Sequence, residues 1–483
     1  MFSYSVLKQF NEISKIFVRY KNPRHHWSVQ RKKIHPVDKA LAHFDDFYRE
    51  VFQKKWPSIR EGLLGKQKYV AVVNNYGDSD ETMAHLELTG ALNIRRLFNL
   101  EKEYIREQVM KNERNTVLER IWKMDRESEQ LSNIAPNSQV ATACGETNYH
   151  KHSLQASLDS AEIDSRRIID SKNSELSLEL LNEFIPATKV KGNDDFIMES
   201  EHYKMFDATL SFQKKKECDI HFPENLNIYC YEMDNFSDFE ASKTASTGVL
   251  NYYLMDGGSI LPVLALDLKP DCNLLDVCAA PGGKSLLALQ TLYPHCVVSN
   301  DVSMSRTHRI ENVYQQFLYD FKERWLDPGR VKITCYDGRC MPFENFDRIL
   351  VDVPCTTDRH SLKENDNNIF KPDRIKERLK LPELQAELLF SALKLVKKGG
   401  IVVYSTCSLS PIQNDGVINM ALKKIWEETQ IEIIVKDLTA ALLQTHRVFE
   451  LASTKLLKYG HLVIPQKGQN YGPTYFCKLQ RIK

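Results

Sequence analysis

The 483-residue sequence has no excess of charge of either sign, because 65 lysines and arginines face 64 aspartates and glutamates. The formal net charge is only +1, so the chain as a whole has no field that would by itself attract nucleic acid. It also lacks an apolar run of the length that a membrane-spanning helix needs. A nucleic-acid surface on this chain must therefore be local or must come from a partner.

The eleven cysteines contain no Cys-x-x-Cys pair and no histidine spacing of the kind found in zinc sites. Their odd number, the chain length and the absence of a secretory signal pattern predict reduced thiols and argue against a disulfide scaffold. With 42% hydrophobic and 27% charged residues, the composition is that of a globular protein of two or three domains. Each cysteine therefore has to be judged by its own context.

The N-terminal part of the sequence divides into two predicted segments. Residues 1–33 carry eight basic side chains against one acid, with apolar residues at helical spacing, which predicts a mitochondrial presequence. The alternative is a basic helix that remains on the protein and contacts RNA. Residues 34–124 place apolar side chains along one helical face, so we predict an N-terminal helical domain that is packed and not catalytic.

The middle of the sequence changes composition twice. Residues 125–183 are rich in Ser, Asn, Gln and charge, with Tyr149 as the only aromatic side chain, and predict a disordered insertion. Residues 184–251 are a linking segment. From 252 to 483, strand and helix signals alternate as in a parallel sheet covered by helices. Beyond the first strand at 274, four further strands are expected at 297–301, 331–338, 348–352 and 401–405.

The stretch from Leu274 to Ser285 predicts a strand, a tight loop and the start of a helix. Gly282 and Gly283 let the backbone turn sharply and approach a ligand, and the helix start offers unpaired N–H groups. A phosphate-binding loop would need glycine at the position of Cys278, which disfavours a nucleotide hydrolase. An ordinary turn and the first loop of an S-adenosylmethionine-dependent methyltransferase remain as alternatives.

Acidic residues end three successive predicted strands, where ligands bind in open α/β sheets. Asp301 can accept hydrogen bonds from both ribose hydroxyls of an adenosine. Asp337 can accept one from an exocyclic adenine amine. Asp352 ends the next strand. Each acid alone would be unremarkable, but together they predict a cofactor site.

Two cysteines follow neighbouring strand ends, Cys355 in Asp-Val-Pro-Cys and Cys407 in Ser-Thr-Cys-Ser. Together with the loop of Gly282 and Gly283, here called the glycine loop, these motifs resemble those of the Sun-domain RNA cytosine-5 methyltransferases. They occur in the same order as in that family, and the resemblance covers residues 252–483. Residues 356–362 and 471–478 are similar to the branch that modifies mitochondrial ribosomal RNA. Many family members have a small residue and glycine after the Pro-Cys, where this chain has Thr356 and Thr357.

The resemblance implies a Rossmann-like class I methyltransferase sheet of seven strands, parallel except for a late reversed one. It also implies that the Cys407 thiolate adds to cytosine C6, since C5 is a poor nucleophile, and that Cys355 assists release. Asp352 would bind cytosine N3 and pair with Lys284. The implied S-adenosyl-L-methionine contacts are Gly282, Gly283, Lys284, Asp301, Arg306, Asp337, Gly338 and Asp352.

The two cysteines have two alternative roles. DNA cytosine methyltransferases use the Pro-Cys cysteine as nucleophile, which would exchange the roles of Cys355 and Cys407, but the Thr-Cys motif favours the RNA assignment. The remaining alternative is that both are small buried residues of a sheet.

The resemblance implies methylation of ribosomal RNA in the mitochondrial matrix and a role in ribosome biogenesis. It also implies an mTERF-family helical-repeat partner that would supply RNA affinity, and no membrane contact. The alternative function is an assembly factor of the mitochondrial ribosome for which methylation is dispensable. The near-neutral charge keeps that alternative open, because an RNA enzyme acting alone would usually be more basic.

Overall fold

The computed structural model describes residues 35–108, 110–111, 212–342 and 345–483. The predicted presequence, 1–33, and the predicted disordered insertion, 125–183, lie outside these residues. The chain forms two compact units, one of residues 1–102 with 198–483 and the other of residues 103–197. All elements named below belong to the first unit.

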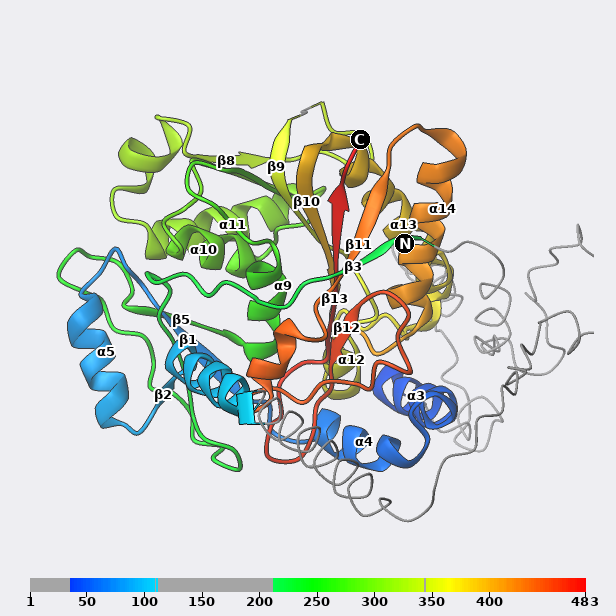
Figure 1. The fold of residues 1–483 in the computed structure, drawn as a ribbon, viewed down its shortest axis with the longest axis horizontal. Coiled ribbons are helices and arrows are strands. Elements are labelled where there is room, and N and C mark those ends of the chain that lie inside the picture. The colour runs from blue at the N-terminus through cyan, green and yellow to red at the C-terminus, as the bar shows by residue number, and fades with distance from the viewer. Residues whose placement is uncertain (1–34, 109, 112–211, 343–344) are drawn as a thin grey trace, which may run out of the picture. The chain divides into compact units, whose positions relative to one another are not determined.

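The larger sheet of the described residues has nine strands, and its path runs β3-β11-β13-β10-β9-β6-β7-β8, with β12 paired to β13 (Figure 1). Only β13 runs against its neighbours β10, β11 and β12, while the other pairs are parallel. The Rossmann-like fold is therefore confirmed, and β13 is the late reversed strand. The sheet has nine strands and not the expected seven, because β3 pairs at the edge with β11 and β12 pairs with β13. The strands are β3 (Lys214–Lys216), β6 (Asn273–Asp276), β7 (Cys296–Asn300), β8 (Val331–Thr334), β9 (Phe346–Asp352), β10 (Val396–Thr406), β11 (Ile433–Asp437), β12 (His461–Val463) and β13 (Thr474–Arg481).

The central strands are apolar on both faces because helices cover both sides of the sheet. Leu274 and Val403 belong to one hydrophobic core and Leu275 and Val402 to the other, as the two-residue period of a strand requires. Figure 1 shows α10 and α11 on one side of the sheet and α13 and α14 on the other. These four helices are α10 (Gly283–Gln290), α11 (Met304–Phe317), α13 (Ile375–Leu395) and α14 (Val417–Glu428), and a shorter helix, α9 (Ile260–Ala265), precedes β6 in the sequence.

A second, antiparallel sheet has the order β2-β4-β1-β5, formed by Leu92–Asn93, Ile228–Cys230, Tyr69–Val73 and Tyr252–Asp256. The segment 34–124 thus differs from the predicted helical domain, because it contributes two strands besides α3 (Pro36–Phe52), α4 (Trp56–Leu64) and α5 (Ser79–Leu88). The partner strands come from the predicted linking segment and from residues just after its end at 251. Pairing over such sequence distances leaves no local pattern, which is why it escaped prediction.

The helices α3 and α4 pack against the core on one face of the large sheet. Phe44 and Ile59 lie in the same hydrophobic cluster as Ile349 and Val402 of the central strands. The helices α3 and α4 therefore share a hydrophobic core with the central strands of the large sheet. No helix among the described residues is long and apolar enough to span a membrane.

Candidate active site

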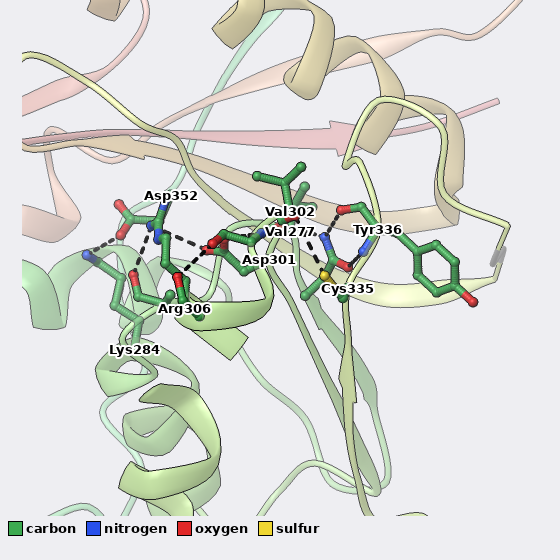
Figure 2. A network of polar contacts seen from close by, with 12 residues as sticks. Val277, Lys284, Asp301, Val302, Arg306, Cys335, Tyr336 and Asp352 are labelled. Atoms are coloured by element: carbon green, nitrogen blue, oxygen red, sulfur yellow. Dashed lines mark hydrogen bonds and ion pairs between the residues drawn. The ribbon is translucent and has the colours of Figure 1, made fainter. Parts of the chain in front are cut away.

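Asp352, the last residue of β9, forms the centre of a polar cluster at the carboxyl ends of the strands. The register of β9 and β10 sets Ser405 opposite Asp352, and the Ser405 hydroxyl donates to Asp352 Oδ1 at 2.7 Å. Lys284, from the first turn of α10, forms an ion pair with Asp352 Oδ2 at 2.7 Å (Figure 2). Burial works against the charge of Lys284, but the neighbouring Asp352 carboxylate raises the pKa of Lys284 overall. Lys284 is therefore a permanent cation beside this carboxylate.

Cys355 and Cys407 lie beside each other, with their sulfur atoms 3.1 Å apart. Their 52-residue separation closes in space because each follows one of two adjacent parallel strands. Cys407 is exposed and lines a cavity of about 320 Å³, together with Thr357 and Pro473. A base could therefore reach the Cys407 sulfur from this cavity.

The thiol pair shares its protons unequally. The hydrogen bond between the two thiols lowers the pKa of Cys355 and raises the pKa of Cys407. Two thiols in contact therefore lose their first proton readily and their second with difficulty. A nucleobase that enters between the two sulfur atoms would break this hydrogen bond. The surrounding charges would then determine which sulfur carries the negative charge.

The glycine loop has two different reasons for its glycines. Gly282 has a φ of 111°, in the left-handed region that side chains disfavour, and precedes the first residue of α10. At Gly283 an added Cβ would lie 2.9 Å from the Tyr253 ring. Gly338 is likewise closed to a side chain, since its Cβ would lie 2.5 Å from Val277 Cγ1. At position 282 the backbone conformation therefore favours glycine, and at positions 283 and 338 close packing leaves no room for a side chain.

Asp301 follows the end of β7 and lies beside Arg306 (Figure 2). It is 1% exposed, and its Oδ2 accepts no hydrogen bond from the described residues, although Arg306 Nη2 forms an ion pair with that oxygen at 3.3 Å. Arg306 Nη2 also donates to the Ala280 carbonyl of the glycine loop at 3.4 Å. A buried carboxylate oxygen with free acceptor capacity fits a ligand that brings hydroxyl groups.

Asp337 differs from the arrangement that the sequence suggested. Its carboxylate accepts from Arg339 Nη2 at 2.7 Å and from Arg339 Nε at 3.0 Å. The hydrogen bonds from Arg339 lower the pKa of Asp337, and Arg339 also pairs with Glu387 at 2.9 Å. Sequence reasoning missed Arg339, two residues after Asp337, so an adenine amine would have to share this carboxylate with a guanidinium.

Asp276, the last residue of β6, is a buried acid to which sequence reasoning gave no role. The Ser285 hydroxyl donates to Asp276 Oδ2 at 2.6 Å. Burial raises the pKa of Asp276 to about 7, and the nearby Asp352 charge acts in the same direction. Its place at the end of an apolar run was the available signal. Within the described residues, no cluster of three His, Cys, Asp or Glu side chains could hold a metal ion.

The raised pKa of Asp276 predicts a specific pH dependence of stability. The folded state keeps a proton that the unfolded chain releases, so this residue lowers the free energy of unfolding as pH rises from about 3.8 to about 7. Asp276→Asn removes the effect, and its stability relative to wild type should therefore increase across that window and stay constant above it. Urea unfolding of both proteins across the window measures the difference. A difference independent of pH would contradict the burial of a titrating carboxyl.

Comparison with known proteins agrees with this geometry. Residues 263–471 match the family described as 16S rRNA methyltransferase RsmB/F. The chain is 33% identical to the 5-cytosine rRNA methyltransferase NSUN4 of Xenopus tropicalis, over 99% of this chain and 98% of that protein. It is 32% identical to the 5-cytosine rRNA methyltransferase nsun-4 of Caenorhabditis elegans, over 93% of this chain and 92% of that protein.

A further relative matches a shorter stretch. The mitochondrial tRNA (cytosine(34)-C(5))-methyltransferase of Mus musculus is 36% identical, over 54% of this chain and 72% of that protein. The near-complete matches, together with two cysteines that meet at the ends of β9 and β10, lead to one conclusion. The chain belongs to the Sun-domain family of RNA (cytosine-5)-methyltransferases.

Proposed function

We propose that this protein transfers a methyl group from S-adenosyl-L-methionine to C5 of a cytosine in mitochondrial ribosomal RNA. The observation that carries the proposal is the pair of sulfur atoms 3.1 Å apart, with an exposed thiol at Cys407, at the strand ends that hold Lys284 and Asp352. Cytosine C5 gains nucleophilic character only when a thiolate adds to C6, and this site offers such a thiol to an entering base.

Ribosomal RNA is favoured over transfer RNA by the extent of the two matches. The rRNA-modifying relative from Xenopus tropicalis is similar across 99% of this chain, whereas the match to the tRNA-modifying relative covers 54%. The basic and apolar pattern of residues 1–33 supports import into the mitochondrial matrix. A partner of the mTERF family, which would add RNA affinity to a chain of net charge +1, stays a prediction.

Cys407 acts as the nucleophile in this proposal. Its thiolate adds to C6 of the cytosine, and the C5–C6 double bond opens so that C5 becomes electron-rich. The contact with Cys355, burial and the Asp352 charge raise the pKa of Cys407, and the cation of Lys284 acts against them in favour of the thiolate. After C5 carries the methyl group, removal of its proton restores the double bond and breaks the C6–S bond. Cys355, whose sulfur neighbours that of Cys407, assists this release by accepting the C5 proton, and Cys407 leaves as a thiolate.

Asp352 binds the base while the adduct forms. One of its oxygens is held by Ser405 and the other by Lys284, so the carboxylate has a fixed direction. Negative charge develops in the pyrimidine ring when the thiolate adds, and a hydrogen bond at N3 stabilises that charge in the transition state. Because a carboxylate and N3 are both hydrogen-bond acceptors, this bond forms only when one of the two carries a proton.

S-adenosyl-L-methionine, when bound, supplies the methyl group as an electrophile. The residues that would hold it are the glycine loop, Asp301 with Arg306, and Asp337. The buried Asp301 oxygen that lacks a hydrogen-bond donor among the described residues suits the ribose hydroxyls. Gly282 and Gly283 keep side chains out of the loop that would face the cofactor.

Asp301→Asn should weaken cofactor binding by about 10- to 100-fold, because hydrogen bonds to a charged acceptor are each worth about 1.5–3 kcal/mol. Asp337→Asn should weaken it less, since Arg339 already occupies that partly exposed carboxylate. Calorimetric titration of both variants with S-adenosyl-L-methionine measures the two dissociation constants. The reverse order would show that Asp337, and not Asp301, is the main anchor.

The direct test of the substrate is an assay on two RNAs. The protein is incubated with cofactor and either mitochondrial small-subunit ribosomal RNA or mitochondrial transfer RNA, and the digested nucleosides are analysed for 5-methylcytidine. Formation of 5-methylcytidine in the ribosomal RNA is expected. Methylation of transfer RNA alone would overturn the substrate, and rescue of ribosome assembly by Cys407→Ala would show that assembly does not need the methyl group.

A further inference from the structure

The carboxylate of Asp358, the first residue of α12 (Asp358–Lys363), is fully buried. It lies between the loop that carries Cys355 and the loop that carries Cys407, here called the two cysteine loops. Asp358 Oδ1 accepts from the hydroxyl of Thr356, next to Cys355, at 2.5 Å. Its Oδ2 accepts from the Leu409 amide, two residues beyond Cys407, at 2.7 Å. One side chain thus holds both loops.

The two loops are also joined to each other around this carboxylate. The hydroxyl oxygens of Thr356 and Ser408, the residues that follow the two cysteines, lie 2.8 Å apart, and the Ser408 hydroxyl also donates to Asp358 Oδ1 at 3.1 Å. Gln413 accepts from the Thr356 amide at 3.1 Å. Burial raises the pKa of Asp358, whereas these hydrogen bonds favour its charged form. Each of these hydrogen bonds thus involves a residue within two positions of Cys355 or Cys407.

A third connection reaches Asp358 from the N-terminal helices. The hydroxyl of Tyr48, on α3, donates to Asp358 Oδ2 at 2.7 Å across 310 residues of sequence. The Tyr48 ring is 2% exposed and packs against Phe44 and Trp56, with centroid distances of 4.9 and 5.5 Å. A ring held on both sides fixes the position of its hydroxyl, so α3 fixes one oxygen of Asp358.

The groups around the cysteines act in opposite directions on the two thiols. The contact with Cys407 lowers the pKa of Cys355, against burial and the negative charge of Asp358. The contact with Cys355, burial and the negative charge of Asp352 raise the pKa of Cys407, against the positive charge of Lys284. Other titratable groups of this region are Asp352, beside Cys407, the Tyr48 hydroxyl, and the buried Tyr404, which interacts with Cys355. Arg359 follows in sequence, but its donors go to the Gly62 and Gly472 carbonyls and to Asn470.

We propose that Asp358 is a positioning residue that sets the separation of the Cys355 and Cys407 sulfur atoms, and that Tyr48 makes helix α3 a working part of the active site. The inference rests on the proposed function for its effect on turnover. Its geometric content, the approach of two thiols, is independent of any methyl transfer.

Tyr48→Phe removes only the hydroxyl, and Asp358→Asn removes the charge. Tyr229→Phe is the matched control, because the buried Tyr229 hydroxyl also donates to a carboxylate, that of Glu87 at 3.1 Å, in the four-stranded sheet. Two quantities are measured for each variant. One is kcat and KM for methyl transfer to RNA. The other is the rate at which diamide, itself reduced to the hydrazine, oxidises Cys355 and Cys407 to a disulfide, followed by peptide mass spectrometry.

Tyr48→Phe should lower kcat and slow the disulfide, each by about tenfold, with KM for RNA unchanged, because one hydrogen bond to the charged acceptor is lost. Asp358→Asn should have a larger effect on both quantities, and Tyr229→Phe should change neither. Wild-type values of kcat and of the oxidation rate in Tyr48→Phe, or equal losses in Tyr229→Phe, would overturn the proposal. If wild type methylates no RNA, the proposed function fails, and the oxidation rates alone still decide whether Asp358 positions the sulfur atoms.

Discussion

Cys407→Ala should lower the rate of methyl transfer by about 10⁴-fold or more, because the proposed mechanism has no second nucleophile for cytosine C6 and removal of a nucleophile has effects of that order. The cavity that Cys407 lines is open, so RNA and cofactor should bind the variant as they bind wild type. A radiolabelled methyl-transfer assay measures the rate, and filter binding measures affinity for RNA. A variant that keeps more than a tenth of wild-type activity would show that another group is the nucleophile.

Cys355→Ala provides the comparison for that experiment. It leaves the Cys407 thiol in place and removes the group assigned to release, so attack on C6 should continue while turnover stops. It also removes the sulfur whose hydrogen bond with Cys407 raises the pKa of Cys407. If the roles of the two cysteines were exchanged, as in DNA cytosine methyltransferases, Cys355→Ala would be the variant unable to attack the base.

Asp352→Asn should lower kcat by about 10²- to 10³-fold, the usual cost of losing one group that stabilises charge in the transition state. The amide can donate a hydrogen bond to N3 but cannot transfer a proton to it, and it leaves the partly buried Lys284 without its carboxylate. The variant should therefore also be less stable than wild type. Steady-state kinetics and thermal unfolding measure the two effects separately.

Asp347→Asn is the matched control for Asp352→Asn. Asp347 lies on the same strand and pairs with Lys397 at 2.8 Å, a distance similar to that between Lys284 and Asp352. It is placed near the opposite end of β9 from the cysteines, so its loss should lower stability modestly and leave kcat unchanged. Equal losses of kcat in both variants would mean that Asp352 acts only through the stability of the strand.

Much of the sheet and of the catalytic cluster could be predicted from sequence because both depend on local patterns. The strands that end near Asp276, Asp301 and Asp352 are short apolar runs, and parallel strands bring their carboxyl ends to one edge. That rule is enough to predict that Cys355 and Cys407 meet. The same patterns could not give the 3.1 Å contact, which depends on the register of β9 and β10.

What escaped prediction depends on contacts between distant segments. Tyr48 reads as one apolar position of an amphipathic helix, and only the fold brings its hydroxyl to Asp358. Tyr69–Val73 is a five-residue run whose partners lie more than 150 residues away, at Ile228–Cys230 and Tyr252–Asp256. Thr357 stands where many family members have glycine, and it adopts a φ of 48°, a conformation that costs a side chain about 1–2 kcal/mol.

The most direct test of the account is to trap the bond between Cys407 and RNA. The Cys355→Ala protein is incubated with S-adenosyl-L-methionine and mitochondrial ribosomal RNA, and the mixture is separated on a denaturing gel. A covalent protein–RNA adduct is expected, attached at Cys407 by peptide mass spectrometry and absent when Cys407→Ala is added. An adduct that survives the double substitution, or none at all from a variant that binds both cofactor and RNA, would contradict the assignment of Cys407 as the nucleophile.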